Sequence, residues 1–244
     1  MIVGISRPPF DAIINNGYDI DIHDMQADSD EALLSAWQQG DKQAGSQLFK
    51  RYIVSMERFF RNKQIQAADE YDLVQRVFLG CVKGAPGFRG DASFRTYLFK
   101  IARNVLGDYL RAQMRRPQVV DLDQISVADL ATGVSTLQAR NRQHALLLEG
   151  LRAIPVNDQT VLELYYWEKM TALQIGEIID LAEPAVRGRI GRAKKRLFEA
   201  MKQRAQSPEE LRLTLDGFEC WADELRVNLG RDGRTTPTSG ETQP

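Results

Sequence analysis

Apolar residues recur at helical spacing along almost the whole of this 244-residue chain. Three stripes, with steps of three and four residues, occupy residues 48–60, 73–82 and 94–110, and a shorter one lies near Leu33 and Trp37. Residues three and four apart share one face of a helix, so each stripe predicts an amphipathic helix with one buried face. No segment alternates with a period of two for long enough to indicate a sheet. The spacing therefore predicts an all-α protein.

Breaks in this pattern divide the chain. A loop with three glycines and a proline, residues 83–93, separates two of the predicted helices. Periodicity then fails over an acidic stretch and returns further along. We predict two small helical domains joined by an acidic linker, with a helical extension at the C-terminal end. The five parts are an acidic N-terminal segment (1–27), a first helical domain (28–116), the linker (117–137), a second helical domain (138–204) and the extension (205–244), which has one helix and a disordered tail.

Charge is sorted along the chain, although the formal net charge is only -1. Residues 184–204 carry eight Lys or Arg and a single acid, whereas the first thirty residues carry six Asp and a single Arg. A concentrated basic segment indicates an anionic partner whatever the net charge. Two cysteines cannot build a disulfide framework, and neither a membrane-spanning apolar run nor a secretory signal is visible. The chain is therefore predicted to be cytoplasmic and to have no membrane partner.

The basic segment belongs to a helix-turn-helix pattern, TALQIGEIIDLAEPAVRGRIGRAKKRL, residues 171–197. Thr171 is predicted to cap the first helix, Asp180 to enter the turn in a left-handed conformation, and Leu181 to plug the turn. Pro184 then opens a second helix, in which apolar residues recur at steps of four, three and four. The other positions of this helix are mostly basic, and such a helix can enter the major groove of DNA. A solvated basic face on an ordinary surface helix is the alternative.

Residues that could carry catalysis are sparse. His23 and His144 lie far apart, and no cluster has the spacing of zinc ligands. The loop KGAPGFRG lacks the Gly-Lys-Ser/Thr ending of a phosphate-binding loop. Asp69, Glu70 and Asp72 form an acidic group, but acids gather at helix starts for electrostatic reasons. The chain is therefore predicted not to be an enzyme and to have no catalytic residue, no metal and no cofactor.

Three segments together resemble the extracytoplasmic-function (ECF) sigma factors of bacterial RNA polymerase. DEYDLVQRVFL (69–79) is similar to the region-two helix that docks on polymerase, and FRGDASFRTYLFKIARNVLGDYLRAQMRR (88–116) to the loop and helix that hold the melted −10 element. Residues 151–197 are similar to region four, which reads the −35 element. The resemblance implies an alternative sigma factor that directs core RNA polymerase to specific promoters and initiates transcription in response to a signal. Its implied partners are core RNA polymerase and promoter DNA, with an anti-sigma protein as a further one.

The resemblance also implies site residues. The polymerase contacts would be Asp72, Val74, Gln75 and Phe78. The −10 element would be held by Phe88, Arg89, Arg103, Asn104 and Arg111, which supply the basic and aromatic groups that unstacked bases need. The −35 element would be read by Ala185, Arg187, Gly188, Arg189, Arg192 and Lys195. Val74 and Phe78 lie on an apolar stripe, so a place in the core is the alternative for both. Arg76 stands where the family usually has an acid, and Asp108 is expected to orient Arg111 rather than to touch DNA.

Several alternatives stay open. A stand-alone dimeric helix-turn-helix regulator would share the C-terminal domain but need no polymerase surface, and an adaptor would use the basic helix against an acidic protein. The linker would thread the channel that later holds nascent RNA, or it is simply solvated. The extension would dock on one domain and tune activity, or it extends the core of the second domain. Gly188 and Gly191 inside the basic helix indicate a close approach of DNA, or only a weak helix.

Overall fold

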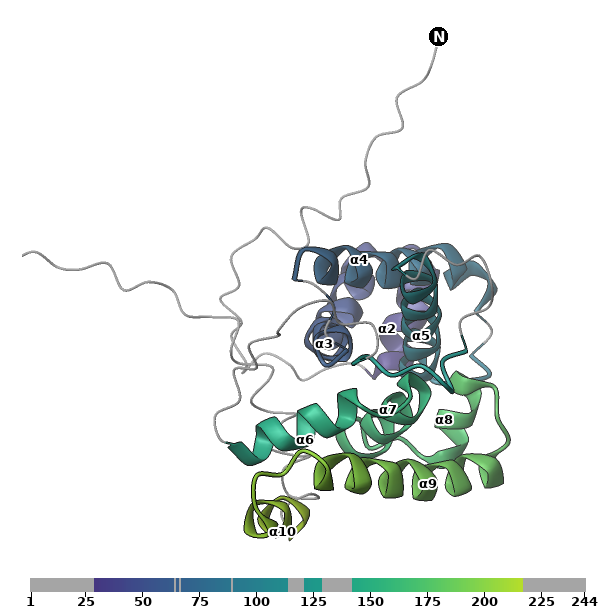
Figure 1. The fold of residues 1–244 in the computed structure, drawn as a ribbon. Coiled ribbons are helices and arrows are strands. Elements are labelled where there is room, and N and C mark those ends of the chain that lie inside the picture. The colour runs from purple at the N-terminus through teal and green to yellow at the C-terminus, as the bar shows by residue number, and fades with distance from the viewer. Residues whose placement is uncertain are drawn as a thin grey trace, which may run out of the picture. The chain divides into compact units, whose positions relative to one another are not determined.

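The computed structural model describes residues 29–63, 65, 67–88, 90–113, 121–128 and 142–216. The chain divides into two compact units, residues 1–52 and 53–244. Within the described ranges every regular element is a helix, apart from an isolated bridge between two residues (Figure 1). The prediction of an all-α protein is confirmed. Arg89, the acidic N-terminal segment and the predicted tail lie outside the described residues.

The first unit contains α2 (Asp30–Gln38) and the start of α3 (Lys42–Arg61). The Ser29 hydroxyl caps α2 by accepting a hydrogen bond from a backbone N–H of the first turn at 3.2 Å. The Trp37 ring packs edge-on against Phe49, with 5.0 Å between the ring centroids. The short helix expected near Trp37 is therefore present and packs on the helix that follows it.

The second unit begins with the rest of α3 and holds two groups of helices. Its further elements are α4 (Ala67–Gly84), the 3-10 turn η2 (Ala85–Gly87), α5 (Phe94–Gln113), α6 (Arg142–Arg152), α7 (Val156–Leu162), the π-helical turn η3 (Glu163–Trp167), α8 (Ala172–Ile179), α9 (Glu183–Lys202) and α10 (Pro208–Asp216). α4 and α5 pack together, and α6, α7 and α8 each pack on α9 or beside it (Figure 1). α5 also packs on α8. The two groups thus meet within one unit.

Each group has an apolar core made by the faces that the sequence spacing marks. The first core includes Phe60, Leu73, Val77, Phe78, Phe94, Leu98 and Leu106, all of which are buried. The second includes Leu146, Leu147, Leu151, Trp167, Leu197 and Met201. α10 packs on α6 and α9, and its Leu211 and Leu215 are partly buried against the second core. The described part of the extension therefore enlarges that core, and the rest of the extension, from residue 217 on, lies outside the described residues.

The described part of the predicted linker, residues 121–128, runs beside the loop between α6 and α7 and the start of α7. The Val156 N–H donates to the Ile125 carbonyl at 2.9 Å, and the Asn157 N–H donates to the Leu122 carbonyl at 3.0 Å. Val127, in the same stretch, is 3% exposed. These backbone bonds fix the path of this part of the linker beside the start of α7.

The helix-turn-helix forms as predicted except at one residue. Thr171 and Gln174 make a reciprocal capping box, in which the Gln174 N–H donates to Thr171 Oγ1 at 3.2 Å. Asp180 adopts the left-handed conformation, with φ 58° and ψ 45°. The prediction that Leu181 plugs the turn is wrong, because its side chain is exposed. The turn is closed by backbone instead: the Leu181 N–H donates to the Gly176 carbonyl at 3.0 Å, and a Cβ on Gly176 would lie 2.4 Å from the Leu181 oxygen. The tight approach requires glycine at 176, which the sequence analysis missed.

Candidate nucleic-acid interface

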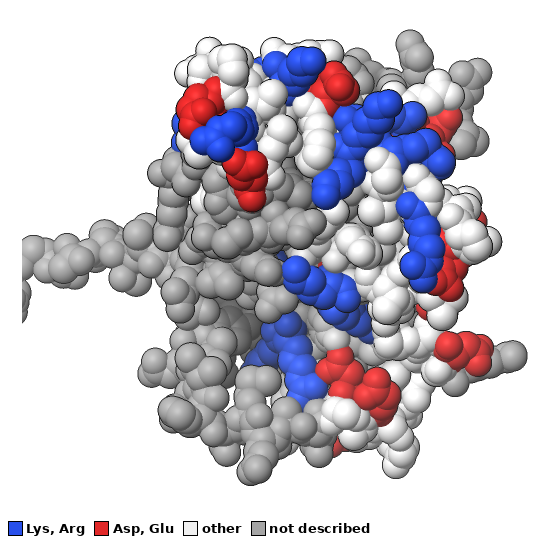
Figure 2. All heavy atoms as spheres, turned by 90° about the horizontal axis from the view of Figure 1, so that it is seen from below, with Lys and Arg blue, Asp and Glu red and all other residues white. Residues whose placement is uncertain are grey.

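α9 carries its apolar residues on one face and its cations on the others. Val186, Ala193 and Leu197 are buried, as their spacing predicts. Ala185, Arg187, Gly188, Arg192 and Lys195, all predicted for the −35 element, are exposed. Figure 2 views the molecule from the side on which α9 and α10 lie in Figure 1 and shows basic groups spread over this face, with acidic groups between them. The helix thus presents several cations to solvent.

A groove of about 450 Å³ runs between residues 153–155 and the C-terminal half of α9. Its lining includes Arg192, Lys195, Arg196 and Arg204, with Glu199 as the acidic member. The groove continues the exposed basic surface of α9 toward the end of the helix. Such a concentration of cations suits the phosphate oxygens of a nucleic-acid backbone.

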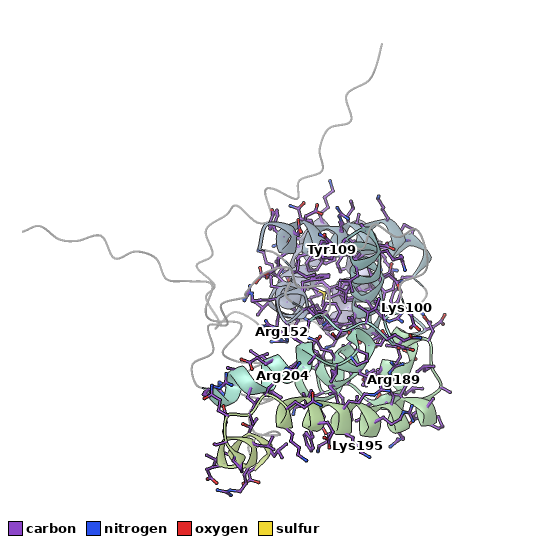
Figure 3. The ribbon with its side chains drawn as sticks, in the orientation of Figure 1. Lys100, Tyr109, Arg152, Arg189, Lys195 and Arg204 are labelled. Carbon is purple, nitrogen blue, oxygen red and sulfur yellow. The ribbon has the colours of Figure 1, made fainter. Side chains whose placement is uncertain are left out.

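Arg189 differs from the other predicted −35 residues. Its side chain is 13% exposed, against 71% for Arg187, which pairs with Glu183 one turn earlier on the same helix. Figure 3 shows Arg189 on the side of α9 toward α7 and Lys195 on the opposite side. Arg189 Nε donates to Asp158 Oδ1 at 2.8 Å. The sequence pattern does not distinguish Arg189 from Arg187; the fold does.

Asp158, on α7, is a buried carboxylate that the sequence analysis missed. It is 1% exposed and accepts hydrogen bonds from both Arg189 and Arg196. A buried carboxylate requires such partners, since removing it from water is costly. The two arginines lie 31 and 38 residues further along the chain, so no local spacing could mark the contact. Asp158 fixes α9 on α7.

A second carboxylate, Asp123 of the linker, also binds Arg189. Asp123 accepts a hydrogen bond from Arg189 Nη2 and another from Asn157 Nδ2, the latter at 2.6 Å. Burial acts to raise the pKa of Asp123, but the hydrogen bonds from Arg189 and Asn157 outweigh it and hold that pKa below its usual value. Burial likewise acts to lower the pKa of Arg189, and Asp123 and Asp158 raise it instead.

The predicted −10 residues lie on α5 and the loop before it. Asn104 is exposed, and the Phe88 ring lies against Tyr97 with 4.5 Å between centroids. Arg111 pairs with Asp108, which is the orienting contact expected from the sequence. Arg103 is only partly exposed: its Nε donates to Asn157 Oδ1 at 3.3 Å, and burial lowers its pKa.

Through Asn157, Arg103 belongs to the same polar cluster as Asp123 and Arg189. The cluster thus joins one residue predicted for the −10 element and one predicted for the −35 element. In this arrangement both guanidinium groups are held by partners within the chain.

The four residues of α4 that are predicted to contact polymerase differ in exposure. Val74 and Phe78 are 6% and 1% exposed, so the structure places both in the core, which is the alternative given for them above. Asp72 is exposed and pairs with Arg76 at 2.7 Å, and Gln75 is partly exposed. The exposed face of α4 also carries three apolar side chains, Tyr71, Leu79 and Val82, which are 49%, 42% and 44% exposed. Val82 ends the apolar stripe of residues 73–82, and the prediction that it is buried with that stripe is wrong.

Cations of α3, of the turn after it and of α5 pair with carboxylates of the second group of helices. Glu168 binds Arg58 and Arg95, and Lys63 binds Glu163. The partners are separated by 73 to 110 residues, so no local pattern could predict these pairs. Among the described residues, no group of His, Cys, Asp and Glu could hold a metal ion, and no helix is long and apolar enough to cross a membrane.

Comparison with known proteins shows which family this chain belongs to. Residues 48–116 match Sigma-70 region 2, and residues 144–197 match Sigma-70 region 4. The chain is 30% identical over 175 residues to the ECF RNA polymerase sigma-E factor of Escherichia coli strain K12, an alignment that covers 68% of this chain and 91% of that protein. The sigma-E factor of Haemophilus influenzae is 29% identical over 175 residues, covering 68% and 92%. The solved structure of CnrH, in complex with the cytosolic domain of CnrY, is similar in fold, with a TM-score of 0.54 at 24% identity over 73% of this chain and 100% of that one. Both sigma regions are therefore present in the expected order, and the chain belongs to the ECF sigma factors.

Proposed function

We propose that this protein is an alternative sigma factor that directs core RNA polymerase to specific promoters and does not itself catalyse a reaction. The observation that carries the proposal is the exposed basic face of α9 in a capped helix-turn-helix, with Arg187, Arg192 and Lys195 open to solvent. An arginine in the major groove can donate two hydrogen bonds to a guanine, and lysines bind phosphates. We assign these three residues to the −35 element.

The exposed face of α4 is the surface we assign to core polymerase. Asp72, Gln75 and Leu79 stand at steps of three and four along the helix and so share a face. Solvent-exposed apolar residues beside charged ones are typical of a protein interface. A dimeric regulator that binds DNA alone needs no such surface, so this face favours the sigma factor over that alternative.

We assign Asn104, Arg103, Arg111 and Phe88 to the melted −10 element. Asn104 and Arg111 lie on α5 about two helical turns apart, and Phe88 precedes the helix in the loop. Unstacked bases are bound by aromatic and amide groups beside a basic surface. The residues available here fit that requirement.

The test is transcription in vitro with purified core enzyme and fragmented genomic DNA, with the RNA 5′ ends sequenced. The wild-type chain is expected to produce a defined set of start sites and to co-purify with core enzyme. Arg192→Ala is expected to reduce initiation at those sites by about 5- to 150-fold, the equivalent of about 1–3 kcal/mol for one base contact, while binding to core enzyme is unchanged. Asp72→Ala is expected to weaken binding to core enzyme instead.

Arg212→Ala is the matched control, since it removes an exposed arginine on α10 that pairs with Glu209 and Asp216. It is expected to leave both readouts unchanged. If core enzyme gives the same RNA with and without the chain, or if Arg192→Ala abolishes polymerase binding, the proposed division of labour is wrong. Unaided, tight binding to a palindromic duplex would favour the dimeric regulator.

A further inference from the structure

Arg189 is held at two points of one guanidinium group. Its Nε donates to Asp158 Oδ1 at 2.8 Å, and its Nη2 donates to Asp123 Oδ1. The inner contact uses the nitrogen nearest the side-chain stem, and the outer contact uses a terminal nitrogen. The terminal nitrogens of an arginine are those that reach an anion beyond the helix surface.

The two carboxylates are not equivalent. The Asp158 side chain is 2% exposed, lies on α7 and also binds Arg196, so it stays with α9 as long as this domain is folded. The Asp123 side chain is 50% exposed and belongs to the linker. Ion pairs with one solvent-exposed member are weak, so a competing anion can displace Asp123 much more readily than Asp158.

We propose that Asp123 is an internal competitor of promoter DNA: it occupies the terminal nitrogen of Arg189 that would otherwise bind a DNA phosphate. The proposal rests on the proposed function, because it takes α9 as the DNA-binding helix. Carboxylate and phosphate oxygens are both anionic acceptors that fit the donor fork of a guanidinium group, so one can replace the other. When Asp123 dissociates, the hydrogen bond to Asp158 still holds the Arg189 side chain in its orientation.

The linker backbone keeps this competitor at its site. The hydrogen bonds from Val156 and Asn157 to linker carbonyls lie on either side of Asp123, at 2.9 and 3.0 Å. Asn157 also donates to the Asp123 carboxylate and accepts from Arg103. Release of Asp123 therefore also removes one hydrogen-bond partner of Asn157, the side chain that binds the predicted −10 residue Arg103.

The test measures binding of the full chain to a short fluorescein-labelled duplex of mixed sequence by anisotropy, at salt concentrations from about 50 to 200 mM. Asp123→Asn removes the charge from a half-exposed side chain and keeps its size. It is expected to bind the duplex more tightly than wild type at the lowest salt. The slope of log K against log salt is expected to become steeper by about 0.9, the value for one additional phosphate contact.

The same measurement in an Arg189→Ala background tests the mechanism. Arg189→Ala alone is expected to change binding little, because Asp123 and Asp158 already occupy Nη2 and Nε of Arg189, and it is expected to abolish the gain from Asp123→Asn. Glu31→Gln, which removes one exposed carboxylate of α2, is the control for net charge and is expected to leave the slope unchanged.

Three results would overturn the proposal. In the first, Asp123→Asn leaves the affinity for the duplex and the salt slope unchanged, while Arg192→Ala and Lys195→Ala weaken binding. This result would support DNA binding by α9 and contradict competition by Asp123. A gain that persists without Arg189, or that Glu31→Gln reproduces, would show a general charge effect. If Arg192→Ala and Lys195→Ala leave duplex binding unchanged, α9 is not the DNA surface and the proposed function fails with it.

Discussion

Replacing Lys63 with methionine is expected to destabilise the protein strongly, although the side chain keeps nearly the same volume. Lys63 is 1% exposed; its ammonium donates to Glu163 and, at 3.1 Å, to the Phe59 carbonyl. It also lies 3.7 Å from the centroid of the Phe59 ring. Burial lowers the pKa of Lys63, against the opposing charge of Glu163. The substitution removes the charge and both hydrogen bonds with little change in packing.

The size of the stability loss depends on the partners that Glu163 keeps after Lys63 is replaced. That carboxylate is 3% exposed and keeps a hydrogen bond from Gln159 Nε2 at 2.8 Å. Breaking a buried ion pair by removing one partner costs about 3–5 kcal/mol. The bond from Gln159 and the nearby charge of Arg58 compensate in part, so we expect a loss of about 3 kcal/mol. For a chain of this size that corresponds to a fall in Tm of about 6–12 °C.

The loss has a defined pH dependence. Burial already raises the pKa of Glu163, and Lys63 opposes that shift. Without Lys63 the folded-state pKa rises further, while the unfolded-state pKa does not change. The folded variant therefore binds a proton at Glu163 more tightly than the unfolded chain does. The stability that this protonation contributes is present at low pH and is lost as the pH rises through the folded-state pKa. The difference from wild type is expected to shrink as the pH is lowered toward about 5.

Urea unfolding followed by far-UV circular dichroism measures the effect. Arg76→Met is the matched control, because it breaks an ion pair whose side chains are 58% and 54% exposed; we expect a change of at most about 0.5 kcal/mol. In the double variant, Lys63→Met with Glu163→Met, the unpaired charge is gone. Its stability is expected to lie within about 1 kcal/mol of wild type or above it. A Lys63→Met variant as stable as wild type would refute the reasoning, and so would a double variant no more stable than the single one.

Three further substitutions test local features of the fold. Gly191→Ala is expected to raise the free energy of unfolding by about 1 kcal/mol, since a Cβ there meets nothing within 4 Å and alanine favours the helix; thermal melting measures it. Gly176→Ala is expected to cost about 1–3 kcal/mol in the same assay, because its Cβ would lie 2.4 Å from the Leu181 oxygen; equal effects at the two glycines would contradict the structure. Burial raises the pKa of Cys81 to about 12, so this thiol is protonated and shielded from reagents in the folded protein. In a Cys220→Ser variant, a thiolate-specific reagent at about pH 8 is expected to label Cys81 only as fast as the chain unfolds. Immediate labelling would argue against the burial of Cys81.

The sequence by itself determined the features that depend on neighbours a few residues apart. The apolar spacing placed the helices, Thr171 marked the cap of α8, and Asp180 marked the left-handed turn. These follow from local sequence because hydrogen bonds and side-chain contacts within one or two helical turns decide them. The same local order of motifs carried the resemblance to ECF sigma factors. Where the prediction reached beyond local contacts, at Leu181, it was wrong, because a backbone approach at Gly176 closes the turn.

The tertiary structure decided which polar residues are available to a partner. Arg187 and Arg189 are two positions apart and equally basic in sequence, yet one is exposed and the other is held by Asp123 and Asp158. Those carboxylates lie 66 and 31 residues away. An electrostatic contact of this kind depends on distance in space and on burial, and neither is encoded by periodicity along the chain. Packing of α7 and the linker against α9 therefore determines which cations of the DNA-binding helix remain exposed.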